Sequence, residues 1–343
     1  MPLLTTTIGS YPKPPHAPVP ASFDGAWRST ADVVGLVLSE RDEEEIDRAV
    51  HEVVAEQVAI GIDVPTDGEI RREHYIYYHC RHLGGFDFDG LVPKVMRDGG
   101  WTDLVPVTSG PITAGAPFLA RDWRVAQAAT DRPVKATVPG PLTITASSAD
   151  AWYGDERRRA TDLADALNVE IRRLAAAGCG WIQVDEPVFV RDPALANELG
   201  VELLARCFHA VPDHVRRVVH MCCGYPSSLD EDDYPKADAG CYALVAAALD
   251  DAPVDVVSIE DAHRHNDLQL LERFTNTTVT LGMVDIASTK LETVEEIRCR
   301  LLDALRHIDA SRLMAAPDCG LVMLSHQLAV AKLRHLVAAA ASV

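Results

Sequence analysis

The chain has 343 residues, of which 48% are hydrophobic and 24% are charged, a composition typical of a globular protein with a sizeable core. Acidic residues outnumber basic ones by 51 to 32, so the formal net charge at neutral pH is −19. A negative surface potential repels phosphate backbones and anionic lipid headgroups, and we therefore expect neither nucleic acid nor a membrane as a partner.

The first third of the chain contains two strand-like runs, one helix and one irregular segment. The runs Leu4–Ile8 and Ile62–Val64 are rich in β-branched residues, and Glu43–Ile60 between them has the apolar periodicity of a helix. The segment Arg71–Ala128 is rich in Tyr, His, Gly and Trp and is weakly periodic. We expect this segment, 71–128, to be an insertion that covers the mouth of the fold as a lid and not a separate domain.

After residue 130, short β-branched runs alternate with longer amphipathic segments, which is the pattern of repeated βα units. Together with the two earlier runs they make eight. This pattern predicts a (β/α)8 TIM barrel formed by residues 1–343 as one domain, with an open doubly wound α/β sheet as the alternative. The later runs are Pro133–Val138, Trp181–Val184, Arg217–Met221, Val254–Ile259, Thr277–Val284 and Leu313–Ala316, and the helical segments are Asp155–Ala176, Leu195–His209, Thr293–His307 and Gln327–Ala341.

Metal-ligand residue types stand at the carboxyl ends of three predicted strands, where barrel enzymes keep their active sites. His220 and Cys222 are two residues apart, so both side chains can point to the same face of their strand. Glu260 and Cys319 follow two other strands. One imidazole, two thiolates and one carboxylate suit tetrahedral zinc better than magnesium or calcium.

The charge of this site indicates its chemistry. A zinc ion with two cysteinates and one carboxylate has a net charge of −1, which makes it a weak Lewis acid and favours holding a substrate thiol as a nucleophilic thiolate. The alternative is structural, because buried cysteines are often small apolar residues and Glu260 could pair with Arg264 or cap a helix. The eight cysteines are scattered, and the first residues lack the features of a signal peptide, so we expect reduced thiols and a cytoplasmic location.

Seven short motifs, in order along the chain, resemble the catalytic C-terminal half of cobalamin-independent methionine synthase, a zinc barrel that alkylates homocysteine. The resemblance is spread over most of the chain, and the order and spacing of the motifs make it specific. The motifs are Thr7–Pro12, Asp67–Glu69, Pro139–Pro141, Gln183–Pro187, His220–Cys222, Ser258–Glu260 and Pro317–Leu321.

The resemblance implies a methyltransferase of methionine biosynthesis that transfers a methyl group to the thiol of homocysteine. It implies that zinc is the cofactor and that the substrate is held by its two charged groups. The implied zinc ligands are His220, Cys222, Glu260 and Cys319, which with Asp185 form the catalytic set; Ile8 and Ser10 would bind the substrate carboxylate, and Glu69 and Asp185 its ammonium group.

Two carboxylates at strand ends are what an ammonium group requires, so the residues agree with the implied roles of Glu69 and Asp185. For Glu69 the alternatives are a helix cap or a salt bridge with Arg71 or Arg72. Glu186 should face the opposite side from Asp185 and be structural.

One departure from the family pattern concerns the methyl donor, which could be methyltetrahydrofolate or a methylcorrinoid, free or protein-bound. The family has Asp-Ile-His-Ser after the seventh strand, with the histidine as an acid, whereas this chain has Ala287 at that position. A donor whose leaving group needs no protonation, such as a methylcorrinoid, fits this change. His263 or His265 could supply the missing acid.

Two other enzyme classes remain as alternatives. One is a zinc-dependent alkyltransferase or lyase that acts on another thiol, such as coenzyme M with an epoxide. The second is a metal-free enzyme similar to uroporphyrinogen decarboxylase, although strand ends bearing His, Cys, Glu and Asp fit a porphyrin with many carboxylates poorly.

Overall fold

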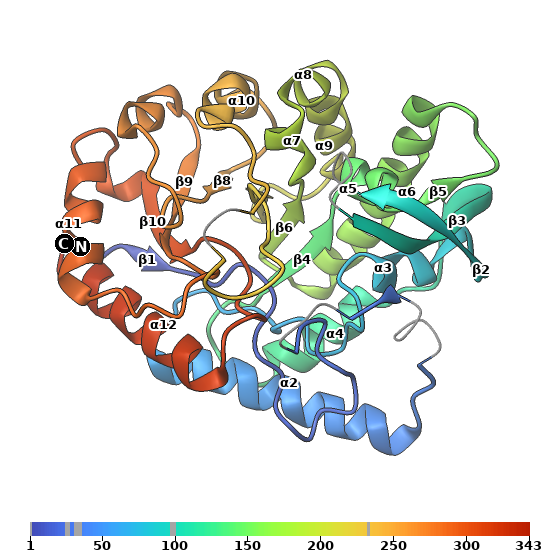
Figure 1. Cartoon of the computed structure of the whole chain (residues 1–343), viewed down its shortest axis with the longest axis horizontal. Helices are drawn as coiled ribbons and strands as arrows, with labels where there is room; N and C mark the ends of the chain where they lie inside the picture. The colour runs from blue at the N-terminus through green and yellow to red at the C-terminus, as the bar shows by residue number, and fades with distance from the viewer. Residues whose placement is uncertain (1, 25–27, 31–35, 97–100, 232–233) are drawn as a thin grey trace.

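The computed structural model describes residues 2–24, 28–30, 36–96, 101–231 and 234–343. Over these residues, seven parallel strands form one curled sheet, and helices pack on its outer side (Figure 1). All neighbouring strands are parallel, so their carboxyl ends meet at one end of the sheet. In spatial order the strands are β1 (Leu4–Thr5), β10 (Leu313–Pro317), β9 (Thr278–Val284), β8 (Val256–Ile259), β7 (Arg216–Met221), β6 (Trp181–Asp185) and β4 (Lys135–Pro139).

The two edges of this sheet are linked through one short segment. Thr6, just after β1, forms a parallel bridge with Val64, and Thr66 forms another with Lys135 of β4. The predicted strand Ile62–Val64 is therefore present as isolated bridges and not as a continuous strand. The predicted run Leu4–Ile8 is also longer than the observed β1.

The helices begin and end close to the predicted residues because their caps are encoded locally. Ser39 and Asp42 form a capping box at the start of α2, Asp155 caps α6, and Thr293 forms a capping box with Glu296 at the start of α11. The α-helices outside the hairpin region are α2 (Glu40–Ile60), α5 (Pro141–Ala146), α6 (Glu156–Ala177), α7 (Val188–Arg191), α8 (Pro193–Leu195), α9 (Val201–Cys207), α10 (Cys241–Asp250), α11 (Val294–Ala304) and α12 (His326–Ala340).

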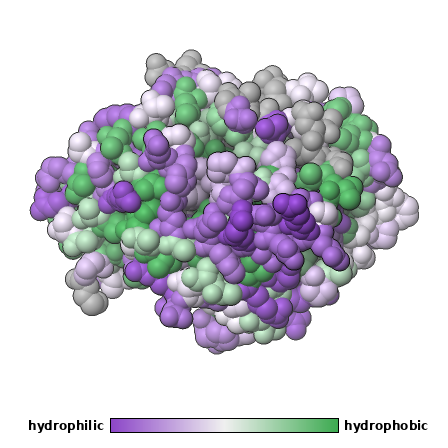
Figure 2. All heavy atoms as spheres, turned by 90° about the horizontal axis from the view of Figure 1, so that it is seen from below, coloured by the Kyte–Doolittle hydropathy of each residue, from purple (hydrophilic) through white to green (hydrophobic). Residues whose placement is uncertain are grey.

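Each long helix is amphipathic. In α6 the apolar stripe of Leu163, Leu167, Ile171 and Leu174 is buried. Figure 2 views the molecule from the side of α2 and shows a hydrophilic band across the middle of this face, as expected for a helix whose sequence begins with Glu, Arg and Asp residues. Among the described helices, none is long and apolar enough to cross a membrane.

The segment 71–128 contains regular structure that its weak periodicity did not predict. It holds α3 (Tyr77–His82), an antiparallel hairpin of β2 (Leu83–Met96) and β3 (Trp101–Ala114), and α4 (Leu119–Gln127). A short strand β5 (Ala149–Asp150) pairs with β3. The hairpin ladder shifts register twice, near Gly84 and again after Asp87, and these irregularities interrupt the alternation by which strands are recognised in a sequence.

The hairpin is held against the body of the protein by two buried or half-buried cations. Lys94 donates from Nζ to the carbonyl oxygens of Thr145, in the last turn of α5, and of Ser148, just after that helix. Arg159 of α6 donates to Thr108 of β3 and to Ala149.

The inner face of the sheet changes character along the strands. At the amino ends, Val218, Val256 and Met314 form a separate buried apolar cluster against Trp181. Two residues further along β7 and β8 the side chains are polar, with His220 and Ser258 at paired positions of the ladder. The polar side chains that could bind a ligand therefore lie toward the carboxyl ends of the strands.

Candidate metal centre and substrate site

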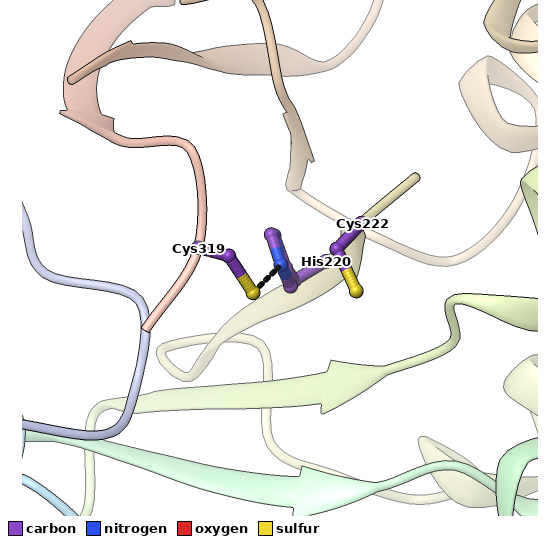
Figure 3. A group of neighbouring side chains, drawn as sticks. All are labelled: His220, Cys222 and Cys319. Atoms are coloured by element: carbon purple, nitrogen blue, oxygen red, sulfur yellow. Dashed lines mark hydrogen bonds between the residues drawn. The ribbon is translucent and has the colours of Figure 1, made fainter. Parts of the chain in front are cut away.

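Three of the four predicted metal ligands lie together at the carboxyl ends of β7 and β10. The ligand atoms of His220, Cys222 and Cys319 are all within 4.8 Å of one another, and all three residues are buried. The distance from His220 Nε2 to Cys319 Sγ is 3.3 Å. Figure 3 shows the imidazole of His220 between the two thiols, which come from residues about a hundred positions apart.

The ring of His220 is oriented by its neighbour on β8. Nδ1 lies 2.9 Å from Ser258 Oγ, and the two residues are opposite each other in the ladder between β7 and β8. When the Nδ1 proton is donated to Ser258, the lone pair of Nε2 is directed at Cys319. A metal-binding histidine is typically held in this way by a hydrogen bond from its other nitrogen.

The pKa values of the two cysteine thiols are shifted in opposite directions. A hydrogen bond from Cys319, with His220 as a further contributor, holds the pKa of Cys222 well below its usual range. Burial and the negative charge of Cys222 raise the pKa of Cys319 well above its usual range. One thiolate is thus already favoured, and a metal ion would displace the remaining proton.

The fourth predicted ligand, Glu260, is in a neighbouring group. Its Oε2 accepts a hydrogen bond of 2.7 Å from the backbone N–H of Cys223 and lies 3.6 Å from Nδ1 of His263. Burial, followed by the negative charges of Cys223 and Cys222, raises the pKa of Glu260 well above its usual range. The charge of Glu260 raises the pKa of Cys319 in the first group. The ligand atom of Glu260, however, lies with those of Cys223 and His263.

Asp185 ends β6 and lies opposite His220 in the ladder between β6 and β7. Burial raises the pKa of its carboxyl to about 7, and the charge of Glu69 contributes to that increase. Its Oδ1 accepts a hydrogen bond of 2.7 Å from Gln183. Asp185 and Glu69 therefore form an electrostatically coupled carboxylate pair, and Asp185 lies next to His220 of the metal-ligand cluster.

Glu69 follows the bridge at Thr66 and has a left-handed backbone, with φ of 56°. Its Oε1 accepts hydrogen bonds from Arg72, at 3.0 Å, and from Thr137 on β4, at 2.9 Å. The salt bridge with Arg72 that the sequence allowed as an alternative is thus present. A Cβ at Gly9 would lie 2.7 Å from the same Oε1, so the loop after β1 is packed directly against this carboxylate.

Ile8 and Ser10 lie on that loop, between the carboxylate pair and the cysteine loop. The carbonyl oxygen of Ile8 accepts a hydrogen bond of 2.9 Å from Gln183. Ser10 O accepts a hydrogen bond of 2.7 Å from the N–H of Leu321, and a Cβ at Gly320 would collide with Ser10 Oγ. The loop after β1 therefore contacts the residue that follows Cys319.

Two further residues at the site were not predicted. Ser258 could have been found, because it precedes Glu260 by two positions and so shares its strand face. Tyr225 lies on the irregular loop after β7, and its hydroxyl donates to the carbonyl oxygen of Gly320, 2.9 Å away. Loop residues such as Tyr225 have no periodic signal in the sequence.

Glu186 has the structural role expected for it. Its carboxylate accepts hydrogen bonds from the backbone N–H groups of Leu142 and Thr143, and so caps the start of α5. At the position of the family histidine, Ala287 is buried, and its carbonyl oxygen accepts from Asp230 N. His263 is paired with Asp318 and His265 with Asp261.

The fold and this site together define a class of protein. Residues 3–342 match the family described as "Cobalamin-independent synthase, Catalytic domain". The chain belongs to this family, and it is a methionine synthase-like enzyme of the methyltransferase class.

Individual relatives are similar over nearly their whole length. The methionine synthase of Sulfolobus acidocaldarius is 30% identical over 340 residues, which cover 98% of this chain and 90% of the relative. The solved structure of a B12-independent methionine synthase from Shewanella sp. W3-18-1, in complex with selenomethionine, is 30% identical with a TM-score of 0.89, covering 99% of this chain and 97% of that one. A methyltransferase from Methanosarcina mazei, 13% identical with a TM-score of 0.61 and covering 99% of this chain and 93% of that one, shares the fold.

Proposed function

We propose that this enzyme transfers a methyl group to the thiol of homocysteine to form methionine, with zinc as its cofactor. The observation that carries the proposal is the placement of the His220, Cys222 and Cys319 cluster beside the buried carboxylate pair of Asp185 and Glu69. A thiol-binding group and an ammonium-binding group next to each other match the two ends of an amino-acid thiol.

The donor set fits zinc. His220, Cys222 and Cys319 would hold the ion, with Glu260 as the fourth ligand, and two thiolates with an imidazole are characteristic of zinc sites. When bound, zinc would supply a Lewis acid that keeps a substrate thiol deprotonated and nucleophilic. A hydrogen bond donated from Nδ1 of His220 to Ser258 would leave Nε2 as the metal-binding nitrogen.

The protein's own charges would orient the amino acid. Asp185 would bind the ammonium group with its carboxylate, and the negative charge of Glu69 would add to this attraction. Oε1 of Glu69 also accepts hydrogen bonds from Arg72 and Thr137. Ser10 and the backbone of Ile8 lie on the loop between this pair and the cysteines, where they would hold the substrate carboxylate. The selenomethionine complex of the Shewanella relative supports a site for an amino acid with a side chain of this kind.

We propose that the methyl donor is methyltetrahydrofolate or a methylcorrinoid, free or protein-bound. The buried Ala287 cannot protonate a leaving group, and this favours the corrinoid. Methionine formation from each donor, measured with the same zinc-loaded protein, distinguishes the two.

We also propose that the sheet is closed into a single-domain (β/α)8 barrel, with 71–128 as its insertion. The two bridges at Val64 and Thr66 support closure, because they place one segment between β1 and β4. The site then lies at the barrel end where such enzymes bind their substrates.

Calorimetric titration of homocysteine into zinc-loaded protein, in two buffers of different ionisation enthalpy, tests the function. We expect binding with release of about one proton per chain, because the thiol loses its proton on binding. Absence of binding, with zinc confirmed by elemental analysis, would contradict the homocysteine assignment. Competition by coenzyme M in the same titration would indicate a different thiol.

A further inference from the structure

A second group of metal-ligand side chains lies next to the first. The ligand atoms of Cys223, Glu260 and His263 are within 4.8 Å of one another. Cys223 follows Cys222 directly and points to the other side of the β7 strand end, while Glu260 and His263 belong to the loop after β8. This group therefore shares the β7 end with the first group, but its other two residues follow β8 and not β10.

His263 in this group is held as a metal-binding histidine is held. Its Nδ1 lies 3.0 Å from Oδ2 of Asp318, and the same oxygen accepts the backbone N–H of His263 at 2.8 Å. Its Nε2 is buried and has no hydrogen-bond partner within the described part of the chain. A carboxylate that holds one ring nitrogen is a usual neighbour of a metal-binding histidine, and the ring of His263 also contacts the side chain of Cys223.

The other two ligands are also fixed and are negatively charged when ionised. The carboxylate of Glu260 accepts the N–H of Cys223, and the backbone N–H of Glu260 donates to Tyr242. The sulfur of Cys223 lies 3.4 Å from the same tyrosine hydroxyl. If a divalent cation displaced the protons of this group, the thiolate and the carboxylate would give a charge of −2 that the cation neutralises.

We propose that Cys223, Glu260 and His263 form a second binding position for a divalent metal ion of the zinc type. One sulfur, one nitrogen and one oxygen ligand select zinc over magnesium or calcium. This second position is separate from the metal site of the proposed function, but Glu260 is a candidate ligand of both positions.

Sharing of Glu260 has a functional consequence. An ion at the second position would use Glu260 as a ligand, and the first position would then have three protein ligands, His220, Cys222 and Cys319. Three protein ligands with an open position are typical of catalytic zinc sites, and four of structural ones. Occupancy of the second position would therefore favour access of a substrate thiol to the first.

Metal stoichiometry tests the proposal with Zn²⁺ alone as the probe. Metal-free protein is dialysed to equilibrium against buffered Zn²⁺, and the ions per chain are measured by elemental analysis. We expect two ions in the native protein, and one each in Cys223→Ser, in His263→Ala and in the double variant Cys222→Ser/Cys319→Ser. Cys299→Ser, which changes an exposed cysteine, is the matched control and should keep two.

The double variant separates this proposal from the proposed function, because it removes the first position and leaves the second. Loaded with Co²⁺, it should show a thiolate-to-metal absorption band that disappears when Cys223→Ser is added. One ion in the native protein, or a second ion that survives both Cys223→Ser and His263→Ala, would overturn the proposal. Circular dichroism shows whether Cys223→Ser and His263→Ala fold. If either does not, the cobalt spectrum of the double variant decides, and absence of the band overturns the proposal.

Discussion

The amino and carboxyl halves of the inner sheet face are built from the same strands, but the first is apolar and the second holds the candidate metal ligands. In β7 the inward residue Val218 belongs to the apolar cluster, and His220, two positions later, belongs to the metal-ligand cluster. In β8 the same step leads from Val256 to Ser258. Stability and chemistry are thus separated by one pleat of the sheet, and substitutions in the two halves should have separable effects.

The largest effect is expected in the carboxyl half. Cys222→Ser should lower zinc affinity and thiol methylation by more than about 100-fold, because replacing even the outer partners of a metal ligand typically costs about 10–100-fold. Zinc content and the rate of methionine formation are the measurements. Cys299→Ser is the control, and full zinc content in Cys222→Ser would contradict the ligand assignment.

In the amino half, the expected loss is of stability alone. Met314 is buried at 3% exposure in the apolar cluster, and Met314→Ala should lower the free energy of unfolding by about 2–5 kcal/mol through lost burial and a residual cavity. Urea unfolding measures the loss, and zinc content measures the separation of the two halves. A variant that loses zinc while still folded would show that the halves are coupled.

Ser258→Ala tests the boundary between the halves. It removes the hydrogen bond to Nδ1 of His220 but no metal ligand, so zinc affinity should fall by about 10-fold to 100-fold. Competition for zinc with a chelator of known affinity gives the value. Unchanged affinity would mean that the ring is held by its other contacts, and Ser258→Thr, which keeps the hydroxyl, should restore binding.

The smallest effect concerns the pH dependence of amino-acid binding. Burial raises the pKa of Asp185 to about 7, and the ammonium group needs the ionised carboxylate. As pH falls below 7 the protonated form accumulates, so affinity should fall about tenfold per pH unit, and it should level off above pH 7. Methionine is the ligand of choice because it has no titrating thiol, and calorimetry between pH 6 and 8 measures its affinity.

Asp185→Asn provides the control for that titration. It should bind methionine more weakly at pH 8 and show no slope between pH 6 and 8. A slope that persists in this variant would assign the titration to another group of the site.

The sequence predicts the repeating part of the fold well, because periodicity and capping are local. The helix caps at Ser39, Asp155 and Thr293 are examples. It did not predict the β2–β3 hairpin, whose register shifts interrupt the alternating pattern. It also did not predict that the strand expected at Ile62–Val64 would pair only through single bridges, at Val64 and at Thr66. Such pairing depends on residues far away in the sequence.

For the site, the strand-end rule correctly brought His220, Cys222 and Cys319 together, because residue spacing fixes which side of a strand a residue faces. It could not place the carboxylate of Glu260, which depends on hydrogen bonds from Cys223 and on the loop that holds His263. Such contacts form between loops, where spacing gives no direction.

The contact between Gly320 and Ser10 joins the loop after the first strand to the loop after the last. During synthesis on the ribosome, the candidate carboxylate-binding loop is made early and Cys319 is made near the end of the chain. A nascent or truncated polypeptide therefore lacks a thiolate ligand and the backing of the Ser10 loop until β10 docks beside β1. The proposed site is therefore complete only when the last strand is paired with the first, and we expect metal binding to report on that pairing.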